Sequence, residues 1–351
     1  AAFAQSTGGG LRYLFGSMAD DYTNFITLFT EFPFCLTDHT GDAYSFSQVF
    51  CILPTLLVLL AGLVVKVGQL LNVKNRMYYF LFGLTLTAAY PFLRMSAVLA
   101  QPDWFGLIFA FAILLLTLDF RFDTLEPARF GLIFLATAAI ILARRWFLYF
   151  VVGYYFAYVL LLVAGCVRLA KDGAVSAALR RGKNLILFGL ASVAAMVILL
   201  WPMVSHILTY NYAGRYSYYN GGGLALEAFY HLGRLGLFNL ILIALGLVFA
   251  AKRKLPALPC LAGCELVVSL LLFTRVQNTG SHQFLLFLPG YFLLFLLGAA
   301  ALAEGIRKHR KLKLFYWAFT LVFAMSVRCS PLTTVALPGF VVDHFPLKAV
   351  S

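Results

Sequence analysis

The sequence is poor in charged residues, and above all in acids. Only 14 of its 351 residues are Asp or Glu, and charged residues of both signs make up 12% of the chain, against 62% hydrophobic residues. A soluble globule of this length needs more polar surface than such a composition provides. We therefore expect a polytopic membrane protein.

The sequence also lacks the patterns of several well-known chemistries. It has no P-loop, no Gly-rich dinucleotide turn, no GxSxG elbow and no internal repeat. The six cysteines form no framework: Cys260 and Cys264 share one helix face without a second pair, which favours free thiols over a metal site. A disulfide between Cys35 and another external cysteine remains an alternative.

Alternating apolar and polar residues, the pattern of a transmembrane β-barrel, are missing as well. Runs such as 185–203 and 284–302 are apolar on all sides, and unpaired backbone cannot face lipid, so the segments are expected to be helices. The predicted fold is an all-α bundle of about ten transmembrane helices. The predicted spans are 49–65, 77–93, 104–118, 130–143, 146–167, 185–203, 235–251, 258–273, 284–302 and 314–327.

Threading these spans sorts the charges between the two sides of the membrane. Clusters of Lys and Arg fall on one side, which the positive-inside bias makes cytoplasmic. They are Lys66, Lys74, Arg76, Arg168, Lys171, Arg180, Arg181, Lys183, Lys252, Arg253, Lys254, Arg307, Lys308, Arg310, Lys311 and Lys313. Topology and contact with anionic membrane lipids explain the net charge of +13, and no basic arm or zinc-finger spacing points to nucleic acid.

One pair of residues breaks this pattern. Arg144 and Arg145 fall outside, in a very short turn, which makes the fourth and fifth spans the least secure part of the threading. The acidic loop residues Asp119, Asp123 and Glu126, with Arg129, fall on the cytoplasmic side, where we expect solvated or ion-paired groups away from any reaction.

The threading also divides the chain into three parts. Residues 1–48 form an external loop with amphipathic helices, 49–330 form the bundle, and 331–351 form an external tail. Because the chain begins outside and without Met, we expect a preceding transmembrane helix to be missing, and further helices to follow the tail. The external segments 1–48, 94–103, 206–234 and 276–283 form the predicted active face.

Acidic residues on this face are the first catalytic candidates. Asp20 and Asp21 form a pair in the first external loop, where a neighbouring like charge favours a carboxylate that must collect a proton. Capping of a helix that starts at Tyr22 is an equal alternative for them. Asp103 follows a Pro at the mouth of the third span, with Arg94 on the same side, and it could likewise cap that helix.

Three motifs together resemble a known superfamily. They are DDY at 20–22, QPD at 101–103 and RVQNTGSHQFLLFLP at 275–289. The chain resembles the GT-C superfamily of polyprenyl-phosphate-dependent glycosyltransferases, in the branch of protein O-mannosyltransferases and aminoarabinose transferases. The resemblance implies that Asp20 is the catalytic base or orients the acceptor, although Asp21 stands where the family usually has Glu. It also maps the family's second acid to Asp103.

The same resemblance implies the ligands and the location. The donor would be a polyprenyl-phosphate sugar and the acceptor an extracytoplasmic glycan, lipid or protein, at the outer face of a bacterial inner (plasma) membrane. Arg275 and His282 could bind the leaving phosphate, with Gln283 beside them, although Arg275 could equally snorkel to headgroups.

Aromatic residues and a glycine run mark another external loop. Tyr210, Arg215 and Tyr216 could stack on and bind a sugar, although tyrosines also anchor chains at membrane interfaces. Gly221–Gly223 suggests a hinge. No cofactor is required. A divalent cation at Asp38, His39 and Asp42 is a minor alternative.

Two hypotheses compete with a glycosyltransferase. A transporter or flippase of lipid-linked or anionic substrates would need ionisable residues within the spans, which we expect to be nearly free of them. An O-antigen polymerase or ligase would rely on external arginines such as Arg215 and Arg275 instead of the acidic pair.

Overall fold

A computed structural model describes residues 14–20, 23–30, 41–98, 103–219, 223–280 and 282–308. Within these ranges every regular element is a helix, which confirms the all-α class. The labelled α-helices are α3 (Gly41–Leu70), α4 (Arg76–Ala88), α5 (Pro91–Val98), α6 (Asp103–Thr117), α7 (Pro127–Ala143), α8 (Phe147–Lys171), α9 (Val175–Leu199), α10 (Trp201–Thr209), α11 (Tyr212–Arg215), α12 (Gly223–Lys252), α13 (Ala257–Phe273) and α14 (Leu288–Lys308).

Helices lie where each of the first nine spans is predicted, whereas the tenth, 314–327, lies outside the described residues. Five helical segments are both long and apolar enough to cross a membrane: Phe46–Leu70, Phe147–Lys171, Val175–Leu199, Gly223–Lys252 and Gln283–Ile306. Three others, α6, α7 and α13, are apolar but shorter. The chain is therefore an integral membrane protein by the length and composition of its helices.

Two predicted spans are interrupted, contrary to expectation. The span 77–93 is divided at Ala89 and Tyr90, between α4 and α5, because Pro91 starts a new helix. The span 185–203 is divided at Leu200, where α10 begins with Pro202 in its first turn. In both places a proline lacks the N–H that would continue the preceding helix.

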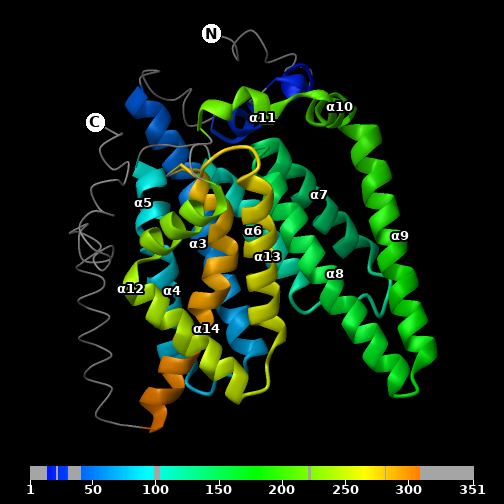
Figure 1. Ribbon diagram of the computed structural model, residues 1–351, viewed down its shortest axis with the longest axis vertical. Coiled ribbons are helices and arrows are strands. Elements are labelled where there is room, and N and C mark those ends of the chain that lie inside the picture. The colour runs from blue at the N-terminus through cyan, green and yellow to red at the C-terminus, as the bar shows by residue number, and fades with distance from the viewer. Residues whose placement is uncertain are drawn as a thin grey trace.

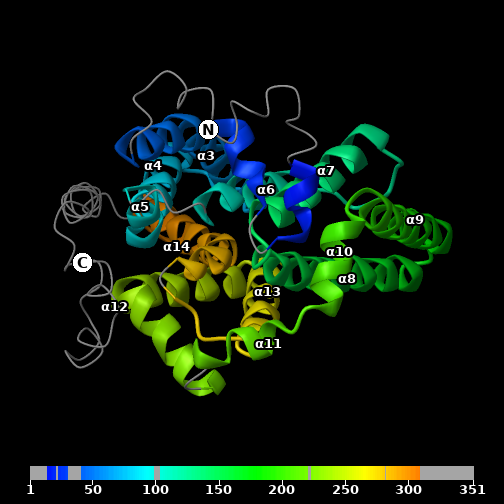
Figure 2. The same cartoon turned by 90° about the horizontal axis from the view of Figure 1, so that it is seen from above.

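Helix α14 forms the centre of the bundle. Of its most apolar window, 89% is buried against neighbouring helices, including α12, α13 and α4. Figure 2 shows α14 between α12 on one side and α4 and α5 on the other. Close approach to α12 depends on small residues: a Cβ on Gly298 would lie 2.5 Å from the Leu242 carbonyl oxygen. Such glycines allow membrane helices to pack backbone to backbone.

Helix α9 lies at the opposite extreme, at the edge of the bundle. Only 6% of its apolar window is buried, and leucines such as Leu179 and Leu190 are exposed. Figure 1 shows α9 standing apart from α7 and joined to α8 at the lower end. In a membrane, lipid chains would cover this face.

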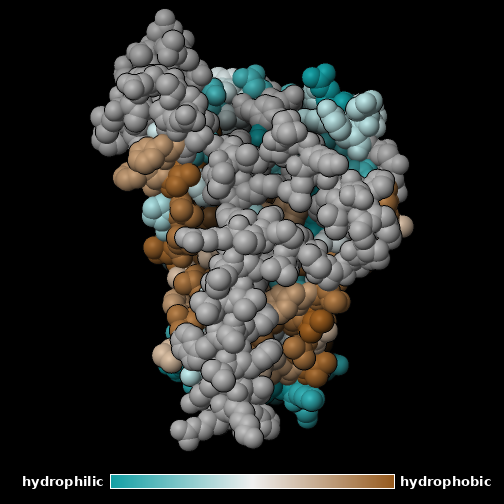
Figure 3. All heavy atoms as spheres, turned by 90° about the vertical axis from the view of Figure 1, so that its left-hand side faces the viewer, coloured by the Kyte–Doolittle hydropathy of each residue, from teal (hydrophilic) through white to brown (hydrophobic). Residues whose placement is uncertain are grey.

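The two ends of the bundle carry different loops. The α8–α9 and α12–α13 connections and the end of α14 lie together at the lower end in Figure 1, whereas α10, α11 and the loop after α13 lie at the upper end. This matches the predicted sorting of the basic clusters to one side. Figure 3 shows hydrophobic residues at mid-height and hydrophilic residues toward both ends of the face it displays.

Ion pairs at the lower end involve the acidic loop residues, as expected. Asp119 binds both Lys66 and Arg129, and Asp123 binds Arg181 at 2.6 Å. The Asp119 side chain is 40% exposed. These pairs connect helix ends and lie away from the upper face.

Candidate functional site: an arginine and aromatic pocket at the upper end

The turn between α7 and α8 builds the site. Arg144 caps the C-terminus of α7 in an extended conformation (φ −159°, ψ 125°), and α8 begins three residues later at Phe147. Three large side chains, Arg144, Arg145 and Trp146, are therefore placed within one tight turn. Its two arginines are the pair that broke the charge pattern of the sequence.

Arg144 makes a buried, two-pronged ion pair with Asp103 at the start of α6. The Nε atom lies 3.0 Å from Oδ1, and Nη2 donates to Oδ2 at 3.2 Å. The side chains are only 12% and 3% exposed. The Nη2 hydrogen bond adds direction to the attraction between the two charges, whereas the Nε–Oδ1 contact lacks hydrogen-bond geometry and acts through charge alone.

Arg145 connects three segments that are distant in sequence. It donates to the Tyr212 hydroxyl of α11 at 2.8 Å, to the Met18 carbonyl at 3.0 Å and to the Asp20 carbonyl. The segment 18–20 is thereby held against the α7–α8 turn.

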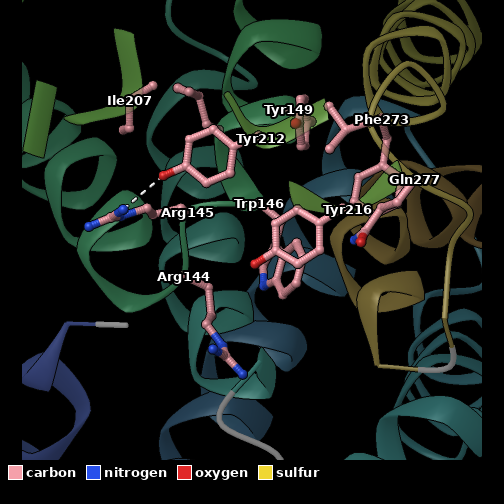
Figure 4. A pocket seen from close by; sticks show the side chains of 11 residues that line it. Arg144, Arg145, Trp146, Tyr149, Ile207, Tyr212, Tyr216, Phe273 and Gln277 are labelled. Carbon is pink, nitrogen blue, oxygen red and sulfur yellow. Dashed lines mark hydrogen bonds between the residues drawn. The ribbon is translucent and has the colours of Figure 1, made fainter. Parts of the chain in front are cut away.

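A pocket of about 250 Å³ opens between these groups. Figure 4 shows Trp146 and Tyr216 at its centre, with their rings tilted by 45° at 6.0 Å between centroids. Arg145, bonded to Tyr212, lies on one side and Gln277 on the other. Its lining residues are Arg144, Arg145, Trp146, Leu148, Tyr149, Ile207, Tyr212, Tyr216, Phe273, Val276 and Gln277. A mostly apolar and aromatic wall with few polar groups is the usual character of a small-molecule site.

His282 lies beside this pocket, with its ring edge-on to Trp146 at 6.1 Å between centroids. Burial lowers the pKa of His282, and Arg144 and Arg234 lower it further, whereas Asp103 raises it. The net direction is down, so the imidazole is neutral near pH 7 and can accept a proton or a hydrogen bond there.

The structure brings Asp20 and Asp103 to neighbouring arginines, although neither acid lines the pocket. Asp103 is buried against Arg144. Asp20 is held through its backbone carbonyl, and its side chain is exposed. Asp21 lies outside the described residues. Thr23 caps the described turn Asn24–Ile26 by accepting from the Phe25 N–H, whereas Tyr22, where the capping alternative for Asp20 or Asp21 places a helix start, lies outside the described residues.

The other predicted site residues divide into two groups. Tyr216 lines the pocket, and His282 packs on its Trp146. Tyr210 stacks on His206 at 4.7 Å and contacts Tyr212 at the rim.

The second group does not line the pocket. Arg215 and Arg275 are exposed. Gln283 is the first residue of the short helical turn Gln283–Phe287 before α14, and its Oε1 occupies the space that a side chain on Gly280 would need. Arg94 lies in α5, and its side chain is not described.

The predicted cation site falls largely outside the described residues. Asp38 and His39 are not described, and Asp42 is described only as part of α3. Among the described residues, no group of three or more His, Cys, Asp or Glu side chains could hold a metal ion.

Sequence reasoning missed Arg144, Arg145 and Trp146 as site residues. The available signal was their violation of the positive-inside pattern, since a cation that resists the topological bias needs a local partner. One predicted span carries a buried acid that was overlooked: Glu265 in α13 is 1% exposed. Glu227, His231 and Arg234, which fall in the predicted external segment 206–234, are buried in α12.

Comparison with known proteins adds no family. No family model matches the chain, and neither the curated proteins nor the solved structures contain a significant match. The geometry of the upper end therefore carries the functional argument.

Proposed function

We propose that the protein is a membrane glycosyltransferase that moves a sugar from a polyprenyl-phosphate donor to an acceptor on the extracytoplasmic side. The observation that carries this proposal is the pocket with two fixed arginines and aromatic walls at the end of the bundle opposite its basic clusters. A prenyl chain needs hydrocarbon, and its phosphate needs cations at the interface, so a site at the helix mouths suits both.

Phosphate recognition follows from the two arginines. With Asp103 counted, the turn carries one net positive charge, and protein partners already hold both guanidiniums in place. A bound phosphate therefore meets fixed N–H donors without ordering long, flexible side chains. Trp146, Tyr212 and Tyr216 offer ring faces to the sugar.

The chemical step needs a base at the rim. In the proposed reaction the Asp20 or Asp21 carboxylate takes the proton of an acceptor hydroxyl, whose oxygen bonds to the anomeric carbon. The bond from that carbon to the phosphate oxygen breaks, and its electron pair leaves on the phosphate, where the arginines stabilise the charge. Attack opposite the leaving group inverts the anomeric configuration.

The test is transfer from a panel of polyprenyl-phosphate sugars in membranes that contain the protein. Asp20→Asn and Asp21→Asn are compared with Asp172→Asn, an exposed residue at the lower end. We expect at least one of the first two variants to lose transfer while the amount of folded protein is unchanged, and the third to keep it. Retained activity in both Asp20→Asn and Asp21→Asn would remove the catalytic role.

A transporter is the second candidate, and buried ionisable residues favour it. Glu265 lies in α13 with its Oε1 accepting from Ser269 at 3.0 Å, and α12 is kinked at Gly236. Ionisable groups and broken helices inside a membrane are typical of transport paths. Sealed vesicles discriminate the two: a transferase yields glycosylated product and a free polyprenyl phosphate, whereas a transporter moves the intact substrate across.

External arginines also favour a polymerase or ligase of lipid-linked O-antigen. The arginines that line the pocket are Arg144 and Arg145, not the predicted Arg215 and Arg275. Loss of transfer in Arg145→Ala with full activity in both acidic variants would select this reading.

A further inference from the structure

Three ionisable side chains of α12 lie on one face of the helix and are almost completely buried. Glu227, His231 and Arg234 follow the i, i+4, i+7 spacing that aligns residues along a helix. Their exposures are 0%, 3% and 4%. Burying such groups is expensive unless each has a partner, so what they contact is informative.

All three side chains contact the same residue, Thr279, in the loop after α13. The Thr279 N–H donates to Glu227 Oε1 at 2.9 Å, and Arg234 Nη2 donates to the Thr279 carbonyl. His231 Nε2 lies 3.3 Å from Thr279 Oγ1, and its Nδ1 lies 2.8 Å from the Tyr291 hydroxyl. Both backbone polar groups and the hydroxyl of one residue are thereby held from a single helix face.

Thr279 lies in a loop that forms part of the pocket. Two residues before it, Gln277 lines the pocket, and three residues after it, His282 packs on Trp146. The intervening Asn278 N–H donates to the Tyr219 carbonyl at 3.0 Å. A shift of Thr279 would therefore move one pocket wall and pull on the segment that follows α11.

The α12 kink gives the three residues their position. Gly236 adopts φ 72° and ψ 157°, which residues with a side chain rarely adopt, and it separates two helical rods. The first rod carries the three buried residues. The Tyr90 hydroxyl fixes its end by donating to the Arg234 carbonyl at 2.9 Å.

We propose that Glu227, His231 and Arg234 act as positioning residues that hold the loop 277–280 in the shape that the ligand pocket requires. Simple helix packing would be served as well by apolar side chains, which avoid the cost of desolvation. Hydrogen bonds to a loop backbone instead fix its conformation. The part of this inference that concerns ligand binding rests on the proposed function. The part that concerns the conformation of the loop does not.

Amide hydrogen exchange of the loop, measured by mass spectrometry on the purified full chain, tests the fixing directly. Glu227→Met removes the acceptor of the Thr279 N–H at similar volume, whereas Glu227→Gln keeps an acceptor oxygen. Glu265→Gln, in a buried carboxyl on α13, is the matched control. We expect fast exchange over 277–280 in Glu227→Met, near-native exchange in Glu227→Gln and no change in Glu265→Gln.

Binding of farnesyl phosphate, with farnesol as the control without phosphate, tests the positioning role in the same samples. Thr279→Val, which loses the hydroxyl, should weaken binding by about 3-fold to 10-fold, the usual effect of one hydrogen bond, and Thr279→Ser should restore it. The melting temperature without ligand reports any general loss of stability.

The outcomes separate the two proposals. Native loop exchange in folded Glu227→Met, or an opened loop with unchanged affinity, would overturn the positioning role. If the wild-type protein shows no preference for farnesyl phosphate over farnesol, the proposed function fails. The hydrogen-exchange result stands apart from that outcome, because slow exchange of the loop in Glu227→Met would by itself show that Glu227 does not fix the loop.

Discussion

The two ends of the bundle use the same kinds of ion pair in different surroundings. At the lower end Asp119 meets Lys66 and Arg129 with its side chain 40% exposed. At the upper end Asp103 meets Arg144 with its side chain 3% exposed. Water screens the first set, whereas the second lies in a medium of low dielectric constant.

This difference separates topology from chemistry. Basic residues at the lower end follow the positive-inside bias and need no specific partner. The two arginines of the α7–α8 turn at the upper end oppose that bias, and each has a defined contact: Asp103 for Arg144, and two carbonyls with Tyr212 for Arg145. A buried charge with a specific partner is therefore a better guide to a functional site than an exposed charge that follows the topology.

The largest expected contrast is between matched acids at the two ends. Asp103→Asn leaves the buried Arg144 without a counter-charge and should destabilise the fold by about 3–5 kcal/mol. Asp119→Asn breaks exposed pairs and should cost about 0–1 kcal/mol. Unfolding in detergent would measure both, and equal losses would remove the distinction between the ends.

The next contrast compares an arginine from each end, Arg145 and Arg129, in its effect on the affinity for farnesyl phosphate. Arg145→Ala removes charged hydrogen bonds worth about 1.5–3 kcal/mol each, so affinity for farnesyl phosphate should fall by about 10-fold or more. Arg129→Ala at the lower end should leave affinity unchanged. Titration calorimetry would measure the dissociation constants, and a similar loss in both variants would point to unspecific attraction of the anion.

Two glycines, one near each end of the bundle, test the backbone. Gly236→Ala forces a side chain into a conformation that costs about 1–3 kcal/mol and should lower the melting temperature. Gly131→Ala in α7 meets nothing within 4 Å and should raise stability by about 0.5–1 kcal/mol. A stabilised Gly236→Ala variant would contradict the kink.

The smallest expected effect concerns pH. Because the folded-state pKa of His282 lies below its unfolded value, the unfolded chain binds a proton first as pH falls below about 6.5. Stability should therefore decrease on acidification, and less so in His282→Gln. Melting temperatures between pH 7.5 and pH 5.5 would measure this, and parallel curves would show that His282 does not titrate as described.

Much of the fold could be predicted from the sequence because apolar length alone forces helices in a membrane. The breaks at Pro91 and Leu200 were missed, since a purely hydrophobic window passes over a proline that starts a new helix. Glu265 was overlooked for the same reason: one acid among apolar neighbours hardly changes a window average.

The site was predicted only in part because its residues come together through tertiary contacts. Asp103 and Tyr216 were singled out from local motifs, and both lie at or beside the pocket. The partners of Thr279 could not be found in that way, since Glu227 is 52 residues away in the chain. Their i, i+4, i+7 spacing indicates a shared face but not what that face contacts.

Photo-crosslinking with a farnesyl phosphate analogue that carries a reactive group next to its phosphate tests the central claim most directly. The account predicts that labelled peptides cover the α7–α8 turn at 144–149 and the segment 212–216, and that unlabelled farnesyl phosphate competes. Labelling confined to the basic lower end, around 66–76 or 252–254, would contradict it.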